Sequence, residues 1–256
     1  MQTAIQPTPK KMKLWRKIVL TLITLLLIAV ISFVIWAKQI YKADQTKLQE
    51  FLNTNKDLIT VTEHPKYWEI APNATTSTKG VIYYPGAKVD PQAYFYKLES
   101  IVTSTSSPSI LFVTKPPLNL AIFSIGQAGK IIDTHPEIKT WTLGGHSMGG
   151  AMACEYAKNH AEKFETLLLV GTYCNSDVSS KNFKVVNIHG SLDGVLTPEK
   201  LSAYSSNLPT SQRDFPIEGM NHAQAGNYGN QKGDLMPTKS DEDVKKEIEM
   251  ILNSEV

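Results

Sequence analysis

Residues 141–151 read Trp-Thr-Leu-Gly-Gly-His-Ser-Met-Gly-Gly-Ala, and this stretch is the strongest indication of the fold in the sequence. It begins as a short strand, and small residues that suit a helix follow from Gly149 onward. Between them, Gly145, Ser147 and Gly149 form the pattern Gly-x-Ser-x-Gly. In this context the serine occupies a strained strand-to-helix turn, and its small neighbours let the backbone fold tightly. The pattern predicts a nucleophilic serine; the alternative is a glycine-rich turn that only packs a helix against a sheet.

Apolar strand-like runs alternate with helix-like segments on both sides of this turn. Near-continuous apolar strands are typical of a parallel sheet that is covered on both faces, and the alternation indicates βαβ units. We therefore expect an α/β fold with a doubly wound, mostly parallel sheet and no large cap domain. The predicted strands are 80–84, 109–113, 140–143, 166–170 and 184–188, with a last strand near 215–217, and the predicted helices are 91–104, 120–132, 149–159, 198–207 and 241–253.

A nucleophilic serine needs a histidine base and an orienting carboxylate, which follow it in the order Ser, Asp or Glu, His in this architecture. His222 follows the predicted last strand and is the expected base, with a surface-loop histidine as the alternative. Asp193 lies in a glycine-framed turn directly after strand 184–188 and is the expected acid. Asp177, after the preceding strand, is the competing candidate.

An oxyanion hole needs two backbone N–H groups, one of them from the residue after the serine, here Met148. The second is expected from the loop after strand 80–84, where Gly86 permits a close backbone approach. Ala87 is the predicted donor, and Gly86 and Lys88 are predicted to contact substrate. The alternative is that Pro85 and Gly86 form an ordinary turn.

A long loop, residues 224–240, follows His222. Loops of this length without regular structure are uncommon unless they function, so we expect it to form one wall of the substrate site, with Tyr228 as a contact. A solvated surface loop is the alternative. Cys154 and Cys174 are expected to be unpaired. No ligand cluster has metal spacing and no glycine-rich loop matches a nucleotide fingerprint, so no metal or cofactor is expected.

The N-terminal part of the chain has the length and charge of a membrane anchor. Residues 18–37 contain no charge, which is about the length of a bilayer-spanning helix, and five basic residues precede them. The positive-inside rule places residues 1–17 in the cytoplasm. A stalk, residues 38–59, and a catalytic domain, residues 60–256, are then expected outside the cytoplasm. A cleaved signal peptide is the alternative. Residues 38–256 carry 21 basic and 24 acidic side chains, which argues against nucleic acid as a partner.

Four segments, residues 84–90, 115–121, 145–151 and 219–224, resemble the α/β-hydrolase superfamily. The resemblance covers residues 60–253. Within the superfamily, the chain is similar to the bacterial α/β-hydrolase fold-5 group, which is related to the dienelactone-hydrolase-like branch. It implies Ser147 as nucleophile, Asp193 as acid and His222 as base. Dienelactone hydrolases proper use a cysteine nucleophile where this chain has Ser147, and the membrane anchor is not part of the fold.

The expected function is hydrolysis of an ester, thioester or small amide through an acyl-enzyme, by a cell-membrane protein with one span and an extracytoplasmic domain. The substrate would be a small-molecule or envelope ester. Acyl transfer with the same three residues is one alternative. A non-catalytic binding module on the same fold is another, because a fold does not fix a function.

Overall fold

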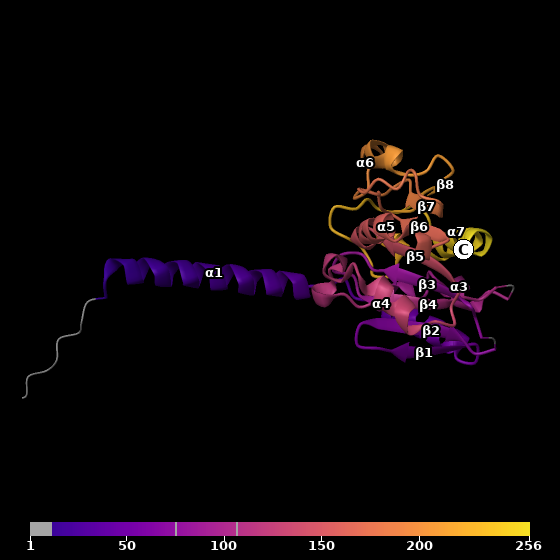
Figure 1. Cartoon of the computed structure of the whole chain (residues 1–256), viewed down its shortest axis with the longest axis horizontal. Coiled ribbons are helices and arrows are strands. Elements are labelled where there is room, and N and C mark those ends of the chain that lie inside the picture. Colours follow the sequence, from indigo (N-terminus) through magenta and orange to yellow (C-terminus); the bar gives the residue numbers. More distant parts are fainter. Residues whose placement is uncertain (1–11, 75, 106) are drawn as a thin grey trace, which may run out of the picture. The chain divides into compact units, whose positions relative to one another are not determined.

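The computed structural model describes residues 12–74, 76–105 and 107–256, in two compact units, residues 1–39 and residues 40–256 (Figure 1). In the first unit, helix α1 spans Leu14–Lys38. It contains the predicted span at 18–37 and is long and apolar enough to cross a membrane. Residues 1–11 of the predicted cytoplasmic tail lie outside the described residues.

The second unit is built on a sheet of eight strands in the order β1-β2-β4-β3-β5-β6-β7-β8. The last six strands in this order are parallel, whereas β1 and β2 pair antiparallel at one end. The parallel strands are β3 (Lys79–Tyr84), β4 (Ile110–Thr114), β5 (Thr140–His146), β6 (Thr166–Val170), β7 (Lys184–Gly190) and β8 (Arg213–Ile217); β1 is Ile59–Glu63 and β2 is Tyr67–Pro72. This confirms the predicted α/β class with its mostly parallel sheet.

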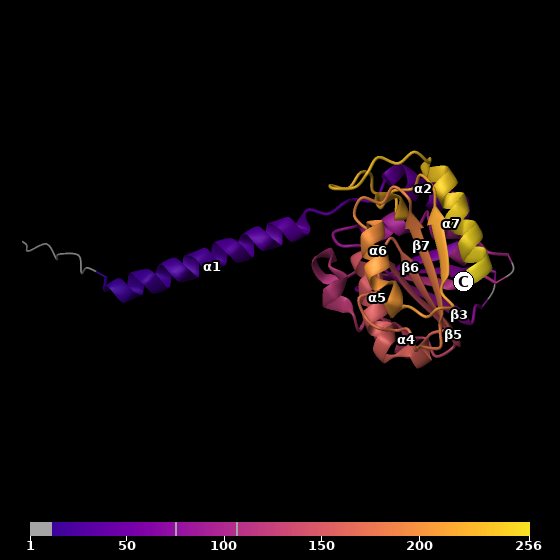
Figure 2. The same ribbon diagram turned by 90° about the horizontal axis from the view of Figure 1, so that it is seen from above.

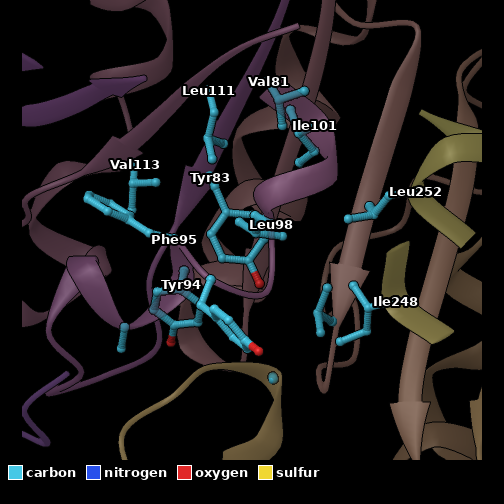
Figure 3. Close-up of a cluster of buried hydrophobic side chains, with 14 of the residues drawn as sticks. Val81, Tyr83, Tyr94, Phe95, Leu98, Ile101, Leu111, Val113, Ile248 and Leu252 are labelled. Atoms are coloured by element: carbon cyan, nitrogen blue, oxygen red, sulfur yellow. The ribbon is translucent and has the colours of Figure 1, made fainter. Parts of the chain in front are cut away.

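Helices cover both faces of this sheet, and each face has its own apolar core. Side chains alternate along β3, so that Val81 and Tyr83 join one core while Ile82 and Tyr84 join the other. Figure 2 shows α7 along one face and α5 and α6 along the other. Figure 3 shows part of the first core, with side chains from β3, β4, α3 and α7. The helices of this unit are α2 (Gln45–Asn55), α3 (Glu99–Thr103), α4 (Gln127–Thr134), α5 (Met148–Asn159), α6 (Pro198–Tyr204) and α7 (Asp241–Glu255).

Because the six parallel strands run in one direction, the loops that follow them meet along one edge of the sheet, which we call the carboxyl edge. The chain moves from β3 to β4 on one side and then returns to β5 on the other. Ligand sites of open α/β sheets lie at the carboxyl edge where the strand order reverses in this way. Ser147 follows β5 at this point.

The sequence predicts a stalk at residues 38–59, but from residue 40 onward they are part of the folded second unit. Residues 40–256 form one compact unit, and α2 packs into its first core through the buried side chains of Leu48 and Phe51. Apolar positions three and four residues apart give the helix one face that can bury itself on the sheet. Asp44 caps the start of α2 by accepting the N–H groups of Thr46 and Lys47.

Two predicted helices are also broken up in the structure. Residues 91–104 form a 3₁₀ turn, Pro91–Tyr94, and the short α3, because Leu98 between them has a non-helical backbone. Residues 120–132 form a 3₁₀ turn, Ala121–Ser124, and α4, whose N-cap is Gly126. Helical periodicity in sequence therefore marks where these segments turn but does not fix their continuity.

Candidate active site

The predicted strand-to-helix turn at Ser147 is present in the structure. β5 ends at His146, α5 begins at Met148, and Ser147 between them has φ 52° and ψ −123°. A positive φ is strained for a residue with a side chain and persists only where the surroundings hold it. Two neighbours hold this one: the Ser147 N–H donates to the Val170 carbonyl at 3.1 Å, and the Ser147 carbonyl accepts from the Thr172 hydroxyl at 2.8 Å.

The glycine after Met148 lets the loop that follows β3 approach this turn. A Cβ atom at Gly149 would lie only 2.1 Å from the Tyr84 carbonyl oxygen and 2.5 Å from that of Pro85. No other residue fits without moving the backbone. The first turn of α5 is therefore in contact with the segment that leads into the predicted oxyanion loop.

Asp193 and His222 are brought together behind this turn. Asp193 follows β7, His222 follows β8, and the Asp193 Oδ2 lies 2.8 Å from the His222 Nδ1, with both side chains 1% exposed. The second carboxylate oxygen, Oδ1, accepts the N–H groups of Val195 at 2.9 Å and Leu196 at 2.6 Å, which fixes the orientation of the carboxylate. The competing Asp177 is exposed, and among the described residues it accepts hydrogen bonds only from Ser179 in its own turn.

The contact with Asp193 also assigns the proton of the His222 ring. Nδ1 donates to the carboxylate, so Nε2 carries the lone pair of the neutral imidazole. His222 Nε2 is buried and has no hydrogen-bond partner among the described residues. A buried unpaired ring nitrogen is rare in structural sites and is what a general base needs before substrate binds.

Asp234, which sequence reasoning missed, holds the His222 loop in place. Its carboxylate accepts the N–H groups of Gly194 at 3.0 Å, His222 at 3.2 Å and Ala223 at 2.9 Å. It thereby ties the turn that carries Asp193 to the turn that carries His222. Asp234 lies within the loop at 224–240, and no local pattern distinguishes it there from an ordinary turn aspartate.

Ser147 and His222 line one open cavity of about 330 Å³ at the carboxyl edge. The wall is mostly apolar, and besides Ser147 and His222 its polar side chains are Thr172, Tyr173, Asn175 and the exposed Lys200. Such a cavity suits an apolar group of a ligand and a few fixed polar contacts. Its lining residues are Ser147, Met148, Ala151, Met152, Gly171, Thr172, Tyr173, Asn175, Val195, Leu196, Lys200 and His222.

Besides Asp193, which reaches the cavity only through His222, four predicted site residues lie outside its lining: Gly86, Ala87, Lys88 and Tyr228. Tyr228 is buried in the first core, its hydroxyl bonds to Gln231, and none of the loop 224–240 lines the cavity. Lys88 has φ 62° and its N–H donates to the Asn119 carbonyl at 2.7 Å, so this loop is held firmly. The N–H groups of Ala87 and Met148 have no acceptor among the described residues.

A second histidine, His146, lies against His222 without reaching the cavity. Its ring centroid is 4.5 Å from that of His222, and its side chain is fully buried. Burial, and then the neighbouring His222, hold the pKa of His146 well below its usual 6.5, so its ring is neutral. Its Nδ1 lies 2.9 Å from the Tyr94 hydroxyl, which also accepts the Gly86 N–H at 2.8 Å. The residue before Ser147 is thus connected to the loop after β3.

Cys154 and Cys174 form a disulfide, so the expectation of two unpaired cysteines is wrong. Cys154 lies on α5, and the loop after β6 folds back over this helix, which brings the two Cα atoms to 5.7 Å. That separation is typical of a disulfide. Cys174 is flanked by Tyr173 and Asn175, both of which line the cavity. The bridge therefore fixes one cavity wall to α5, the helix that follows Ser147.

Comparison with known proteins identifies the fold. No curated protein sequence matches the chain. Solved structures that resemble it include Est1E from Butyrivibrio proteoclasticus, with a TM-score of 0.55, 11% identity, and coverage of 77% of this chain and 98% of that one. Another is a predicted CIB-like hydrolase from Thermoplasma acidophilum, with a TM-score of 0.55, 12% identity, and coverage of 77% and 99%.

At these identities the structural likeness shows the fold alone. A sequence profile described as the alpha/beta hydrolase family matches residues 80–246, which is more than half of the chain and contains Ser147, Asp193 and His222. The chain therefore belongs to the alpha/beta hydrolase family.

Proposed function

We propose that this protein is a membrane-anchored serine hydrolase that cleaves a carboxylic ester outside the cytoplasm. The observation that carries the proposal is the arrangement of His222: one ring nitrogen lies 2.8 Å from the Asp193 carboxylate, and the other is buried with no hydrogen-bond partner in the part of the chain that the structure describes. The same histidine shares a cavity with Ser147, which lies on a strained turn. A nucleophile, a base and an orienting acid in this order can perform acyl transfer.

In this mechanism, the Ser147 Oγ attacks the ester carbonyl carbon while His222 Nε2 takes the hydroxyl proton. The N–H groups of Met148 and Ala87 stabilise the negative oxygen of the tetrahedral intermediate. His222 then gives its proton to the departing alkoxide, which leaves an acyl group on Ser147. A water molecule, deprotonated by His222, then attacks the acyl carbon; the bond to the Ser147 Oγ breaks, His222 returns the proton to that oxygen, and the acid is released. Asp193 stabilises the charged imidazole in both halves.

The cavity supports an ester with an apolar acyl or alcohol group, because Met148, Met152, Val195 and Leu196 form much of its wall. Thioesters and small amides would use the same residues. Acyl transfer to an alcohol would also use them, with the alcohol in place of water. The competing proposal, a non-catalytic binding module, gives no reason for a histidine that is oriented by Asp193 and lines the same cavity as Ser147.

Placement outside the cytoplasm is supported by two features. Five basic residues precede the uncharged stretch at 18–37, three of them before α1 and two in its first turn, which favours a cytoplasmic N-terminus. The Cys154–Cys174 disulfide is the second, because disulfides persist in oxidising compartments and are rare in the cytosol. A periplasmic or external domain on a single N-terminal span accounts for both.

Hydrolysis of chromogenic esters of graded acyl length by the full chain in detergent tests the proposal. Ser147→Ala and His222→Ala should each lower kcat by about 10⁶-fold, as loss of the serine or histidine of a triad does elsewhere. Asp193→Asn should lower it by about 10⁴-fold, whereas Asp177→Asn, the exposed alternative, should leave it unchanged. Equal activity of Asp193→Asn and the wild type would remove Asp193 from the mechanism, and equal activity of Ser147→Ala would remove the mechanism itself.

A further inference from the structure

The exposed apolar side chains of the second unit gather at the carboxyl edge. Among the described residues from 40 onward, six large apolar side chains are exposed. Leu58 lies at the opposite edge, before β1, and Met250 lies on α7. The other four, which follow β4 or belong to the loop after β8, are Ile122, Phe123, Leu235 and Met236.

Lysine side chains surround the first pair, Ile122 and Phe123. Ile122 and Phe123, 51% and 55% exposed, line a surface cavity of about 460 Å³ after β4. Three lysines, Lys66, Lys115 and Lys130, line the same cavity, and no carboxylate does. Lys115 also pairs with Glu63 and donates to the His64 carbonyl, while Lys66 and Lys130 have no ion pair among the described residues. We call Ile122, Phe123 and these three lysines the apolar–basic patch.

The chain enters the second unit beside this patch. The Tyr41 N–H donates to the Lys88 carbonyl at 2.6 Å, and the Lys88 N–H donates to the Asn119 carbonyl at 2.7 Å. Asn119 is three residues before Ile122. On the other side, the Asp44 N–H donates to the Asn227 carbonyl at 2.7 Å, in the loop that contains Leu235 and Met236. The point of entry is therefore at the carboxyl edge, between the two exposed apolar pairs.

Chain length sets how far this edge can be from a membrane. Helix α1 ends at Lys38, and Tyr41 is already fixed to the second unit. Three residues of extended chain reach about 10 Å. If α1 spans a bilayer, as the proposed function has it, chain length limits the attachment point at Tyr41 to about that distance from the end of the span. Exposed apolar side chains with lysines around them are what a surface needs to enter the interface of an anionic bilayer.

We propose that the apolar–basic patch docks on anionic phospholipid, so that the cavity with Ser147 and His222 opens at the membrane surface. Ile122 and Phe123 enter the headgroup region, and the lysines contact phosphate oxygens. The substrate class that this placement selects is an ester carried by a membrane amphiphile. Such a molecule reaches Ser147 from the lipid, without passing through water as a monomer. This inference rests on the proposed function for its anchor and its chemistry.

The patch offers a position for a probe that does not disturb it. Gly126 is exposed, lines the same cavity, and an added Cβ there meets no atom within 4 Å. A Gly126→Cys variant can carry an environment-sensitive fluorophore, because both native cysteines are bridged. Asn253→Cys is the matched control: it is exposed near the end of α7 and lies in a surface depression with Lys79 and Lys184, the first residues of β3 and β7, at the opposite edge.

The full chain, labelled at either position, is placed in phosphatidylcholine nanodiscs with and without phosphatidylglycerol, and quenching by spin-labelled lipid is measured. The proposal expects strong quenching at residue 126 with phosphatidylglycerol and little at residue 253. Quenching at 126 should fall at least fivefold in Ile122→Ser/Phe123→Ser and in Lys66→Gln/Lys130→Gln, since each lysine near an anionic surface is worth about fivefold in binding.

Equal quenching at both positions, or quenching at 126 that ignores phosphatidylglycerol and the lysine substitutions, would overturn the proposal. Labelling of Ser147 by a fluorophosphonate on the same nanodiscs separates this result from the proposed function. Labelling without quenching rejects the docking patch alone. Quenching without labelling rejects the hydrolase mechanism and leaves the patch in place.

Discussion

The hydroxyl of Tyr94 lies 2.9 Å from Nδ1 of His146, and both side chains are completely buried. Burial raises the pKa of Tyr94 and lowers that of His146, so the phenol keeps its proton and the imidazole stays neutral. The phenol therefore donates to His146 while it accepts the N–H of Gly86. This short relay connects the loop after β3 to the residue that precedes Ser147, and it determines the relative position of the two predicted oxyanion donors.

Removal of the Tyr94 hydroxyl should destabilise the protein. In Tyr94→Phe, the Gly86 N–H and the His146 Nδ1 both lose their partner inside the core, which costs about 1–3 kcal/mol in the free energy of unfolding. Tyr83→Phe is the matched control, because the Tyr83 hydroxyl is buried and has no hydrogen-bond partner within residues 12–74, 76–105 and 107–256. Its loss should be neutral or stabilising. Urea unfolding of the full chain in non-ionic detergent measures both, and equal losses in the two variants would rule out the relay.

His146 should make stability depend on pH below neutrality. Its pKa in the folded protein lies well below the 6.5 of the unfolded chain, so below pH 6.5 the unfolded state binds a proton that the folded state does not. The free energy of unfolding therefore decreases as pH falls, by about 1.4 kcal/mol for each pH unit, until the folded pKa is reached. His146→Gln removes this contribution. Unfolding at pH 7 and pH 5 should show a smaller decrease in the variant, and an unchanged decrease would contradict the buried neutral state.

Gly149 should tolerate no side chain. Gly149→Ala places a Cβ 2.1 Å from the Tyr84 carbonyl oxygen, so either the turn at Ser147 or the loop after β3 must move. We expect a loss of more than about 2 kcal/mol in stability, together with loss of ester hydrolysis. At Gly126 an added Cβ meets nothing within 4 Å, and Gly126→Ala should cost less than about 1 kcal/mol. Thermal unfolding and activity of both variants decide this, and a fully active Gly149→Ala would contradict the described contact.

The Cys154–Cys174 bridge should stabilise the folded chain and report its compartment. It closes a loop with a sequence separation of 20, for which chain-entropy arguments give about 3 kcal/mol. A reductant should lower the unfolding midpoint of the wild type but not that of Cys154→Ala/Cys174→Ala. In intact cells, a thiol reagent should modify neither cysteine until a reductant is added. Free thiols in freshly isolated protein would count against both the bridge and the extracytoplasmic placement.

Local patterns in the sequence predict the parts of the site that depend on neighbouring residues. The turn at Ser147 is visible because strand, glycines and helix occur within eleven residues. The alternation of strands and helices predicts a parallel sheet and the edge at which Asp193 and His222 follow their strands. β1 and β2 are not predicted, because they pair antiparallel at the end of the sheet and lack the continuous apolar run of the central strands.

The remaining parts depend on contacts between distant segments, which periodicity does not encode. The disulfide forms because the loop after β6 folds back on α5. Asp234 acts on His222 and Gly194 from a loop that has no regular structure. Tyr94 meets His146 only after β3 and β5 pair side by side. Each of these requires the assembled sheet, so sequence reasoning had no local signal for them.

The most direct test of the central claim is whether Ser147 is an activated nucleophile. The full chain in detergent is treated with a reporter fluorophosphonate, and the modified peptide is identified by mass spectrometry. We expect modification at Ser147 in the wild type and none in Ser147→Ala. In His222→Ala the rate of modification should be strongly reduced, because the base that activates the hydroxyl is absent. A folded wild-type chain that stays unmodified, or one that is modified equally fast without His222, would contradict the claim that Ser147, His222 and Asp193 form a catalytic triad.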